Sequence, residues 1–180
     1  MTIDVDIERL NRNNFRNCLE ALARPGCFFQ VTPFFDSGLM ALAVMLLYSE
    51  VCFYQQAVGD WNMIRALTGS TLSRAETADY LFIDAPSKEA LMAARPGEQH
   101  NPEFSATCIC RCTDLATGTP VTLSGPGIDG VKRTVLPASP DFIHLLAQKN
   151  LHFPLGVDLF FISDNNRILG LPRSTRVELL

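Results

Sequence analysis

The stretch HFPLGVDLFFISDNNRILGLPRSTRV, residues His152–Val177, contains two apolar runs on either side of a polar turn. We expect strands over Gly156–Ser163 and Ile168–Leu171, joined by a tight turn at the sequence DNNR. A last strand is predicted over Thr175–Leu179. Because a tight turn joins antiparallel neighbours, the hairpin predicts an antiparallel strand pair in the sheet that the rest of the chain forms.

Segments with helix and strand patterns alternate along the rest of the chain. Apolar residues at steps of three and four predict a helix over Ile7–Leu22, and capping residues followed by apolar segments predict helices over Gly38–Leu47, Gly59–Leu67, Ser87–Ala94 and Ser139–Asn150. Short apolar or alternating runs predict strands over Phe28–Val31, Val51–Gln55, Tyr80–Asp84, Phe104–Leu115 and Val121–Ser124, the last two separated by a turn at Gly118 and Pro120. Strands that alternate with helices favour a sheet covered by helices on both faces. The sequence therefore predicts an α/β fold, a three-layer α/β/α arrangement with a mixed sheet, in one domain over residues 1–180.

Composition excludes several classes of protein. The 180 residues carry a net charge of −4, and the charges are dispersed, which argues against a nucleic-acid binder and an electrostatic membrane anchor. The longest apolar run, Leu39–Tyr48, is too short to span a bilayer. The first residues, MTIDVDIERLNRNN, contain no apolar signal core, so we expect a cytoplasmic protein whose cysteines are thiols.

Three cysteines alternate in the sequence TCICRC, at Cys108, Cys110 and Cys112. On a strand such residues share one face and lie about 7 Å apart, whereas tetrahedral zinc needs sulfurs about 2.3 Å from the ion. No second CxxC or HxxxH pattern completes a metal site, so we predict no metal. We interpret the three thiols as core-facing side chains; the alternative is a metal or thiol redox site.

Polar residues are concentrated around the last two strands. Arg173, Ser174, Thr175 and Arg176 supply two guanidiniums and two hydroxyls in four residues, which favours binding of an anion or of a partner. Asp158 lies in an apolar strand and needs a partner, because an unpaired buried charge is costly. The alternative hypothesis is that Asp158 pairs with one of the arginines and only stabilises the hairpin.

The turn LSGPGI contains Ser124, Gly125 and Gly127, and such turns offer backbone N–H groups to phosphates. Pro126 removes one donor and no GK[ST] follows, so the turn is not a P-loop and a plain strand-to-loop turn is the alternative. Arg24, at the end of the first helix, joins these candidates for anion or partner binding. The histidines match no metal or catalytic pattern, so the sequence assigns no catalytic residue.

Four of these motifs together resemble a known family. The sequence FPLGVDLFF followed by LGLPRSTRVEL resembles the C-terminal motif of the PhnH family, a small subunit of the carbon–phosphorus lyase system. Phe15 and Arg16 followed by LARPG, PEFSATCICRC and LSGPGI resemble its other motifs in the same order. The resemblance covers residues 15–179, although the central strand of the family is usually aliphatic rather than rich in cysteine.

The resemblance implies more than the residues do. It implies a topology like that of PLP-dependent transferases, without PLP or another cofactor, and homodimers that join other subunits of the lyase complex. That complex supports the coupling of a phosphonate to ATP, giving a ribose 1-phosphonate 5-triphosphate. No chemistry is assigned to this subunit, so it implies no catalytic residue; ligands would be a phosphonate or a nucleotide phosphate.

Two alternatives remain open at this point. A stand-alone enzyme or binder acting on phosphorylated or phosphonate metabolites could use SGPGIDGVKR as its anion site. A metal or thiol redox protein would use the three alternating cysteines instead.

Overall fold

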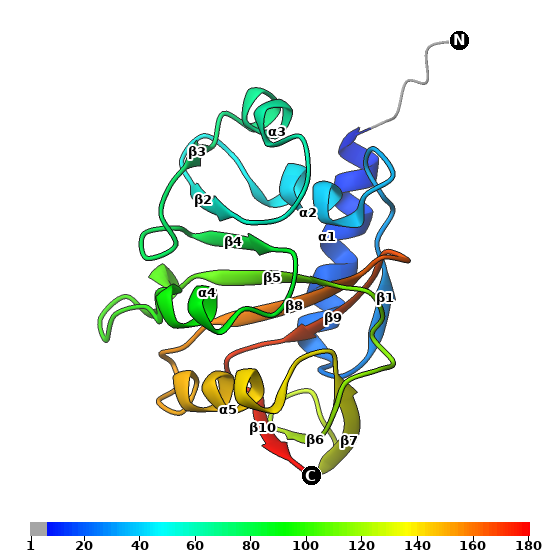
Figure 1. Cartoon of the computed structure of the whole chain (residues 1–180), viewed down its shortest axis with the longest axis vertical. Coiled ribbons are helices and arrows are strands. Elements are labelled where there is room, and N and C mark those ends of the chain that lie inside the picture. The colour runs from blue at the N-terminus through cyan, green and yellow to red at the C-terminus, as the bar shows by residue number, and fades with distance from the viewer. Residues whose placement is uncertain (1–6) are drawn as a thin grey trace.

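A computed structural model describes residues 7–180 of the chain; residues 1–6, which are part of the stretch MTIDVDIERLNRNN considered above, lie outside the described residues. Within the described part, the strands form a seven-stranded and a three-stranded sheet (Figure 1). The larger sheet has the spatial order β1 (Phe28–Gln30), β9 (Arg167–Leu171), β8 (Asp158–Ser163), β5 (Thr107–Cys112), β4 (Tyr80–Ile83), β2 (Cys52–Gln55) and β3 (Thr71–Leu72).

The larger sheet is mixed, as the sequence predicts. Strands β3, β2, β4, β5 and β8 are parallel, whereas β9 runs antiparallel to β8 and β1 antiparallel to β9. The predicted hairpin is confirmed, with Ile162 paired to Ile168 next to the turn. Asn166 in that turn has a φ of 60°, a conformation that asparagine tolerates better than most residues.

Helices cover both faces of this sheet. Helices α1 (Ile7–Ala23), α2 (Gly38–Leu46) and α3 (Trp61–Thr68) pack on one face, and α4 (Lys88–Ala93) and α5 (Pro140–Lys149) on the other. Alternate residues of each central strand supply the two cores: Cys108 and Cys110 face α4 and α5, whereas Ile109 faces α1 to α3. The period of two in TCICRC therefore gives a strand that is buried on both sides.

The smaller sheet contains a strand that the sequence analysis did not predict. It consists of β10 (Arg176–Leu179), β6 (Thr119–Ser124) and β7 (Val131–Leu136), all antiparallel, and it adds Val121, Leu123, Leu136 and Val177 to the core on the α4 and α5 side. The sequence analysis missed β7, because Lys132 and Arg133 stand side by side and break the alternation that marks a strand. In the larger sheet it also missed the two-residue β3, which is too short to show a pattern.

The predicted strand over Phe104–Leu115 is shorter in the structure. A 3₁₀ turn, η1 (Pro102–Phe104), precedes β5, and the chain leaves the large sheet after Cys112. The next strand, β6, pairs with β7 and β10 rather than with β5. Within residues 7–180, no helix is both long enough and apolar enough to cross a membrane.

Candidate functional site

Asp158 pairs with an arginine of the C-terminal segment, at the amino end of β8. Arg173 Nη2 lies 2.6 Å from Asp158 Oδ2, and the backbone N–H of Arg173 donates to Asp158 Oδ1 at 2.8 Å. The two side chains are only 16% and 22% exposed. Because Asp158 begins β8 and Arg173 follows β9, the pair joins the two open ends of the hairpin.

Arg173 also binds two loops. Its Nη1 donates to the carbonyl of Pro102 at 2.7 Å and to that of Pro154 at 3.4 Å, while Nε donates to Asp158 at 3.3 Å. All three guanidinium nitrogens therefore contact protein acceptors, and the side chain acts as a structural group in this arrangement. An anion at this segment would have to use the neighbours of Arg173.

Those neighbours line a cleft of about 490 Å³ between the end of α5 and β10. Arg176 is exposed on the cleft, and Ser174 is half-buried. Thr175 is buried, and its Oγ1 has no hydrogen-bond partner among the described residues. A buried hydroxyl without a partner is uncommon in a native protein, because the desolvation of the group is not compensated.

Close packing explains the glycines of the LSGPGI turn, which joins β6 to β7. A Cβ on Gly127 would lie 2.1 Å from the carbonyl oxygen of Ala23, and one on Gly125 would lie 2.8 Å from that of Ser174. Both glycines also have positive φ, 80° and 126° respectively. The turn thus packs closely against the backbone at the end of α1 and against the backbone of the segment after β9.

The structure therefore gathers several of the predicted residues in one region. Ser124 pairs with Arg176 across β6 and β10, and Gly125 and Gly127 lie beside them. The Arg24 side chain is exposed and binds Glu20 one helical turn earlier at 3.2 Å. Arg24 is thus close to this region through its backbone, while its guanidinium contacts its own helix.

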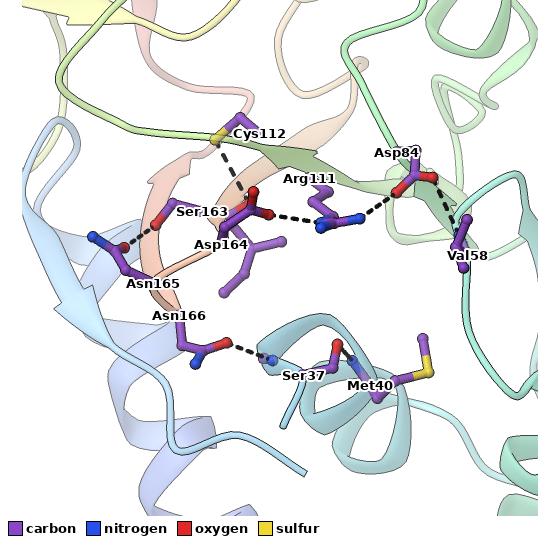
Figure 2. A network of polar contacts seen from close by, with 12 residues as sticks. Ser37, Met40, Val58, Asp84, Arg111, Cys112, Ser163, Asp164, Asn165 and Asn166 are labelled. Atoms are coloured by element: carbon purple, nitrogen blue, oxygen red, sulfur yellow. Dashed lines mark hydrogen bonds and ion pairs between the residues drawn. The ribbon is translucent and has the colours of Figure 1, made fainter. Parts of the chain in front are cut away.

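A second group of polar side chains lies at the opposite end of the sheet, where the parallel strands finish (Figure 2). Arg111, at the end of β5, donates from Nε to Asp164 Oδ1 at 2.8 Å and from Nη1 to Asp84 Oδ1 at 3.2 Å. Asp84 follows β4 and Asp164 follows β8. The hydrogen bonds to Asp164 and then Asp84 raise the pKa of Arg111, which stays a cation.

This group is more open to solvent than the Asp158–Arg173 pair. The side chains of Arg111, Asp84 and Asp164 are 43%, 36% and 45% exposed. Arg111 lies between two hollows, one of about 230 Å³ beside Ser37 and one of about 450 Å³ beside Asp114. Its charge is therefore shared by two carboxylates but remains accessible from both sides.

The start of α2 borders the smaller hollow. Ser37 caps this helix by accepting from the Met40 N–H at 3.2 Å, and Asn166 Oδ1 accepts from the Gly38 N–H at 2.7 Å (Figure 2). Phe35 and Asp36, just before the cap, have φ of 47° and 58°, which is unfavourable for residues with a Cβ. The hydrogen bonds of Ser37 and Asn166 fix the backbone beside the hollow.

The sequence analysis missed Asp84, Arg111 and Asp164. Asp84 and Asp164 come directly after β4 and β8, and Arg111 lies near the end of β5, where the carboxyl ends of parallel strands meet at one edge of the sheet. Here the chain leaves β2 towards α3 on one face and leaves β4 towards α4 on the other, so a crevice is expected at this edge. Strand order was the missing information, because the sequence does not say which strands are parallel neighbours.

Of the three cysteines of β5 that were expected in the core, Cys108 and Cys110 are buried there, whereas Cys112 is half-buried and lines the hollow of about 450 Å³. Burial raises the pKa of Cys108 and of Cys112 to about 12 and raises that of Cys110 well above its usual value. They are therefore protonated thiols at neutral pH, which are poor nucleophiles and poor metal ligands. Among residues 7–180, no group of three or more histidine, cysteine or carboxylate side chains is arranged to hold a metal ion.

Comparison with known proteins links the chain to phosphonate metabolism. The family model described as "Bacterial phosphonate metabolism protein (PhnH)" matches residues 6–178. A protein of Stutzerimonas stutzeri named "Putative C-P lyase subunit protein HtxG" is 32% identical over 179 residues, an alignment that covers 92% of this chain and 84% of that protein.

Proposed function

The chain belongs to the PhnH family of bacterial phosphonate metabolism proteins, and from this premise we propose that it is a subunit of a carbon–phosphorus lyase complex that degrades organic phosphonates. The observation that carries the proposal is the extent of the family match, residues 6–178, which includes every strand of the large sheet. A match of this extent covers both the buried framework and the two polar ends of the sheet.

Within that complex, the subunit supports the coupling of a phosphonate to ATP that forms a ribose 1-phosphonate 5-triphosphate. We assign it a non-catalytic or co-catalytic role. Two features of the site support this role: the β5 thiols are protonated, and Arg173, whose side chain is only 16% exposed, is held by Asp158 and two carbonyls. The chain is proposed to act in the cytoplasm.

The proposed topology is that of a PLP-dependent transferase without PLP, in one domain over residues 1–180. PLP enzymes bind the cofactor through a lysine. The three lysines lie elsewhere: Lys88 pairs with Asp141 at 3.0 Å, Lys132 contacts Cys27 at 3.0 Å and Lys149 donates to the Met92 carbonyl at 3.0 Å. No lysine lines the hollows beside Arg111 in the described part of the chain.

The proposed partners are a second copy of the chain and the other subunits of the lyase complex. A phosphonate or a nucleotide phosphate is the proposed ligand of the region around Arg173, Ser174, Thr175 and Arg176, with Asp158, Ser124, Gly125, Gly127 and Arg24 nearby. Exposed Arg176 on the cleft of about 490 Å³ favours this ligand, because its charge is accessible.

Reconstitution tests the function. The tagged chain is co-expressed with the other lyase subunits, and the purified complex is assayed for conversion of ATP and an alkyl phosphonate into adenine and a ribose phosphonate. Omission of this chain is expected to abolish the product, and the tag is expected to recover the other subunits. Full conversion by the complex that lacks this chain would reject the proposal.

A second candidate, a stand-alone enzyme or binder of phosphorylated or phosphonate metabolites, is favoured only by the cleft beside Arg176. Calorimetry of the purified chain with ATP and an alkyl phosphonate separates the two candidates. Turnover by the chain alone would favour the second. Binding that is lost in Arg176→Ala, without turnover, would place an anion at this cleft within the first.

A further inference from the structure

The smaller hollow beside Arg111 lies outside the carboxyl ends of the parallel strands β5 and β8, where ligands of open α/β sheets bind. Its volume of about 230 Å³ is below the roughly 300 Å³ at which sites for drug-sized ligands begin, so it holds one small ring rather than a whole nucleotide. The polar atoms that line the hollow determine the chemistry of such a ring.

Three of these polar atoms are not used by the fold. Arg111 binds the two carboxylates through Nε and Nη1, and its Nη2 donates to no described residue. Asp164 accepts from Arg111 at Oδ1, while its Oδ2 accepts from no residue within 7–180. Asn166 accepts from the Gly38 N–H at Oδ1, and its amide nitrogen has no acceptor in the described part of the chain. The hollow therefore offers both donors and an acceptor.

The charges at the hollow disfavour a free anion. Two carboxylates, Asp36 and Asp164, line it together with one cation, Arg111. The guanidinium of Arg111 is also bound to a third carboxylate, Asp84. A phosphate at this place would meet more like charge than opposite charge, and such a juxtaposition is costly. A neutral ligand with polar groups avoids this repulsion.

Neighbouring hydroxyl groups fit the mixture of donors and acceptors. A hydroxyl both donates and accepts, so two adjacent hydroxyls can donate to Asp164 and accept from Arg111 at the same time. Carboxylates bind ribose hydroxyls in the corresponding crevice of dinucleotide-binding folds. Because both protein groups are charged, these hydrogen bonds are stronger than those between neutral groups.

The remaining walls suit the rest of a sugar ring. Leu39 and Ile162 are buried apolar residues that line the hollow, and exposed Val58 lies at its border. Ser37 and Asn166, which lie across the hollow from Arg111 and Asp164, fix the start of α2 through their hydrogen bonds (Figure 2). A wall that is held in place before the ligand arrives lowers the entropic cost of binding.

We propose that the smaller hollow binds a sugar ring through two neighbouring hydroxyl groups, which donate to Asp164 Oδ2 and accept from Arg111 Nη2. This site goes beyond the proposed function, which places charged phosphate or phosphonate groups at the opposite end of the sheet. The ribose of a nucleoside and a free sugar share this chemistry, and the experiment separates them.

NMR titration of the isotope-labelled chain with adenosine tests the site. The amide signal of Leu39, at the start of α2, is expected to shift. The analogue 2′,3′-dideoxyadenosine lacks both hydroxyls and is expected to bind about tenfold more weakly or worse. Methyl β-D-ribofuranoside distinguishes the sources: an affinity equal to that of adenosine indicates a free sugar, and a lower one indicates a nucleoside. Inorganic phosphate is expected not to compete.

Variants of the chain test the assigned residues. Asp164→Asn keeps an acceptor for Arg111 Nε but loses the carboxylate, so adenosine should bind about tenfold more weakly. Val58→Trp covers the hollow from an exposed position and should also weaken binding. Asp114→Asn is the matched control, because Asp114 lines the larger hollow on the other side of Arg111, and it should leave the affinity unchanged. Thermal unfolding confirms that each variant folds.

Equal affinities for adenosine and its dideoxy analogue would overturn the proposal, as would the absence of binding or competition by phosphate. Loss of affinity in Asp114→Asn but not in Asp164→Asn would place the ligand in the larger hollow and overturn it too. The reconstitution assay uses the unmodified complex, so its failure would reject the proposed function without changing these binding results.

Discussion

The two ends of the parallel strands hold arginine–carboxylate pairs in opposite environments. At the amino ends, Arg173 is held by Asp158 and by backbone carbonyls, and both side chains are largely buried. At the carboxyl ends, Arg111 is shared by Asp84 and Asp164 between two hollows, and all three side chains are about two-fifths exposed. The same type of interaction therefore has two roles. The Arg173 pair stabilises the fold at one end, and the Arg111 pairs remain accessible to solvent at the other.

The contribution of an ion pair to stability should therefore differ between the two ends. Removal of one partner from a buried pair costs about 3–5 kcal/mol, since the remaining charge is left without compensation. Exposed pairs contribute about 0–1 kcal/mol, because water and salt screen them. The predictions below use this difference, from the largest expected effect to the smallest.

Arg173→Ala is expected to have the largest effect. It leaves Asp158 without a partner and removes the contacts to Pro102 and Pro154, so the free energy of unfolding should fall by about 2–4 kcal/mol. Urea denaturation measures the change. Arg176→Ala is the matched control, because Arg176 is exposed and its loss should cost less than about 0.5 kcal/mol. Equal costs for the two variants would contradict the structural role of Arg173.

Strand β5 runs from one end of the sheet to the other. The burial of its thiols can be tested through the pH dependence of the free energy of unfolding. Burial raises the pKa of Cys108 to about 12, above that of an unfolded thiol. The stabilisation linked to this shift is complete below pH 9 and is lost as the pH rises towards 12, because only the unfolded thiol ionises in that interval. We expect Cys108 to contribute a fall of about 1 kcal/mol in the free energy of unfolding between pH 8 and pH 10.

Cys108→Ala should remove that contribution, so the variant loses about 1 kcal/mol less than the unmodified chain over the same pH interval. Denaturation curves at both pH values provide the comparison. Ile109→Val, in the same strand but without a titratable group, should keep the full pH dependence. If Cys108→Ala keeps it as well, the thiol is not buried as the structure describes.

Arg111→Ala should cost less than about 1 kcal/mol of stability, and its cost should shrink as salt is raised from 50 to 500 mM. The reason is the exposure of Arg111, Asp84 and Asp164. Denaturation at the two salt concentrations measures the effect, with Arg173→Ala as the buried reference. A cost as large and as independent of salt as that of Arg173→Ala would remove the distinction between the two ends.

Thr175→Val should have the smallest effect and the opposite sign. Valine has nearly the same shape and lacks the buried Oγ1 that has no described partner, so stability should rise by about 0.5 kcal/mol. Thermal unfolding measures the change, and Ser174→Ala, at a half-buried neighbour, should be neutral within about 0.5 kcal/mol. A loss of more than 1 kcal/mol would show that the hydroxyl has a partner.

Local patterns predicted most of the fold. The hairpin of β8 and β9 and the alternation of Cys108 with Ile109 were apparent in the sequence. The pairing of Asp158 with an arginine was one of two hypotheses, since a charge in an apolar strand needs a partner. The proposal of an anion or partner at this region stays a prediction.

Tertiary contacts decided what the patterns left open. Strand β7 was missed because its edge position permits adjacent charges, and β6 leaves the large sheet although it follows β5 directly. The network of Arg111 with Asp84 and Asp164 joins residues that are 27 and 53 positions apart, so it exists only once β4, β5 and β8 are parallel neighbours.

By itself, the sequence determined the type of most elements, the burial of β5 and the family, because periodicity and motifs are properties of neighbouring residues. Only the tertiary structure decided the strand order, the separate three-stranded sheet and the environments of Arg173 and Arg111. Burial sets the strength of an ion pair, and burial depends on residues that are distant along the chain.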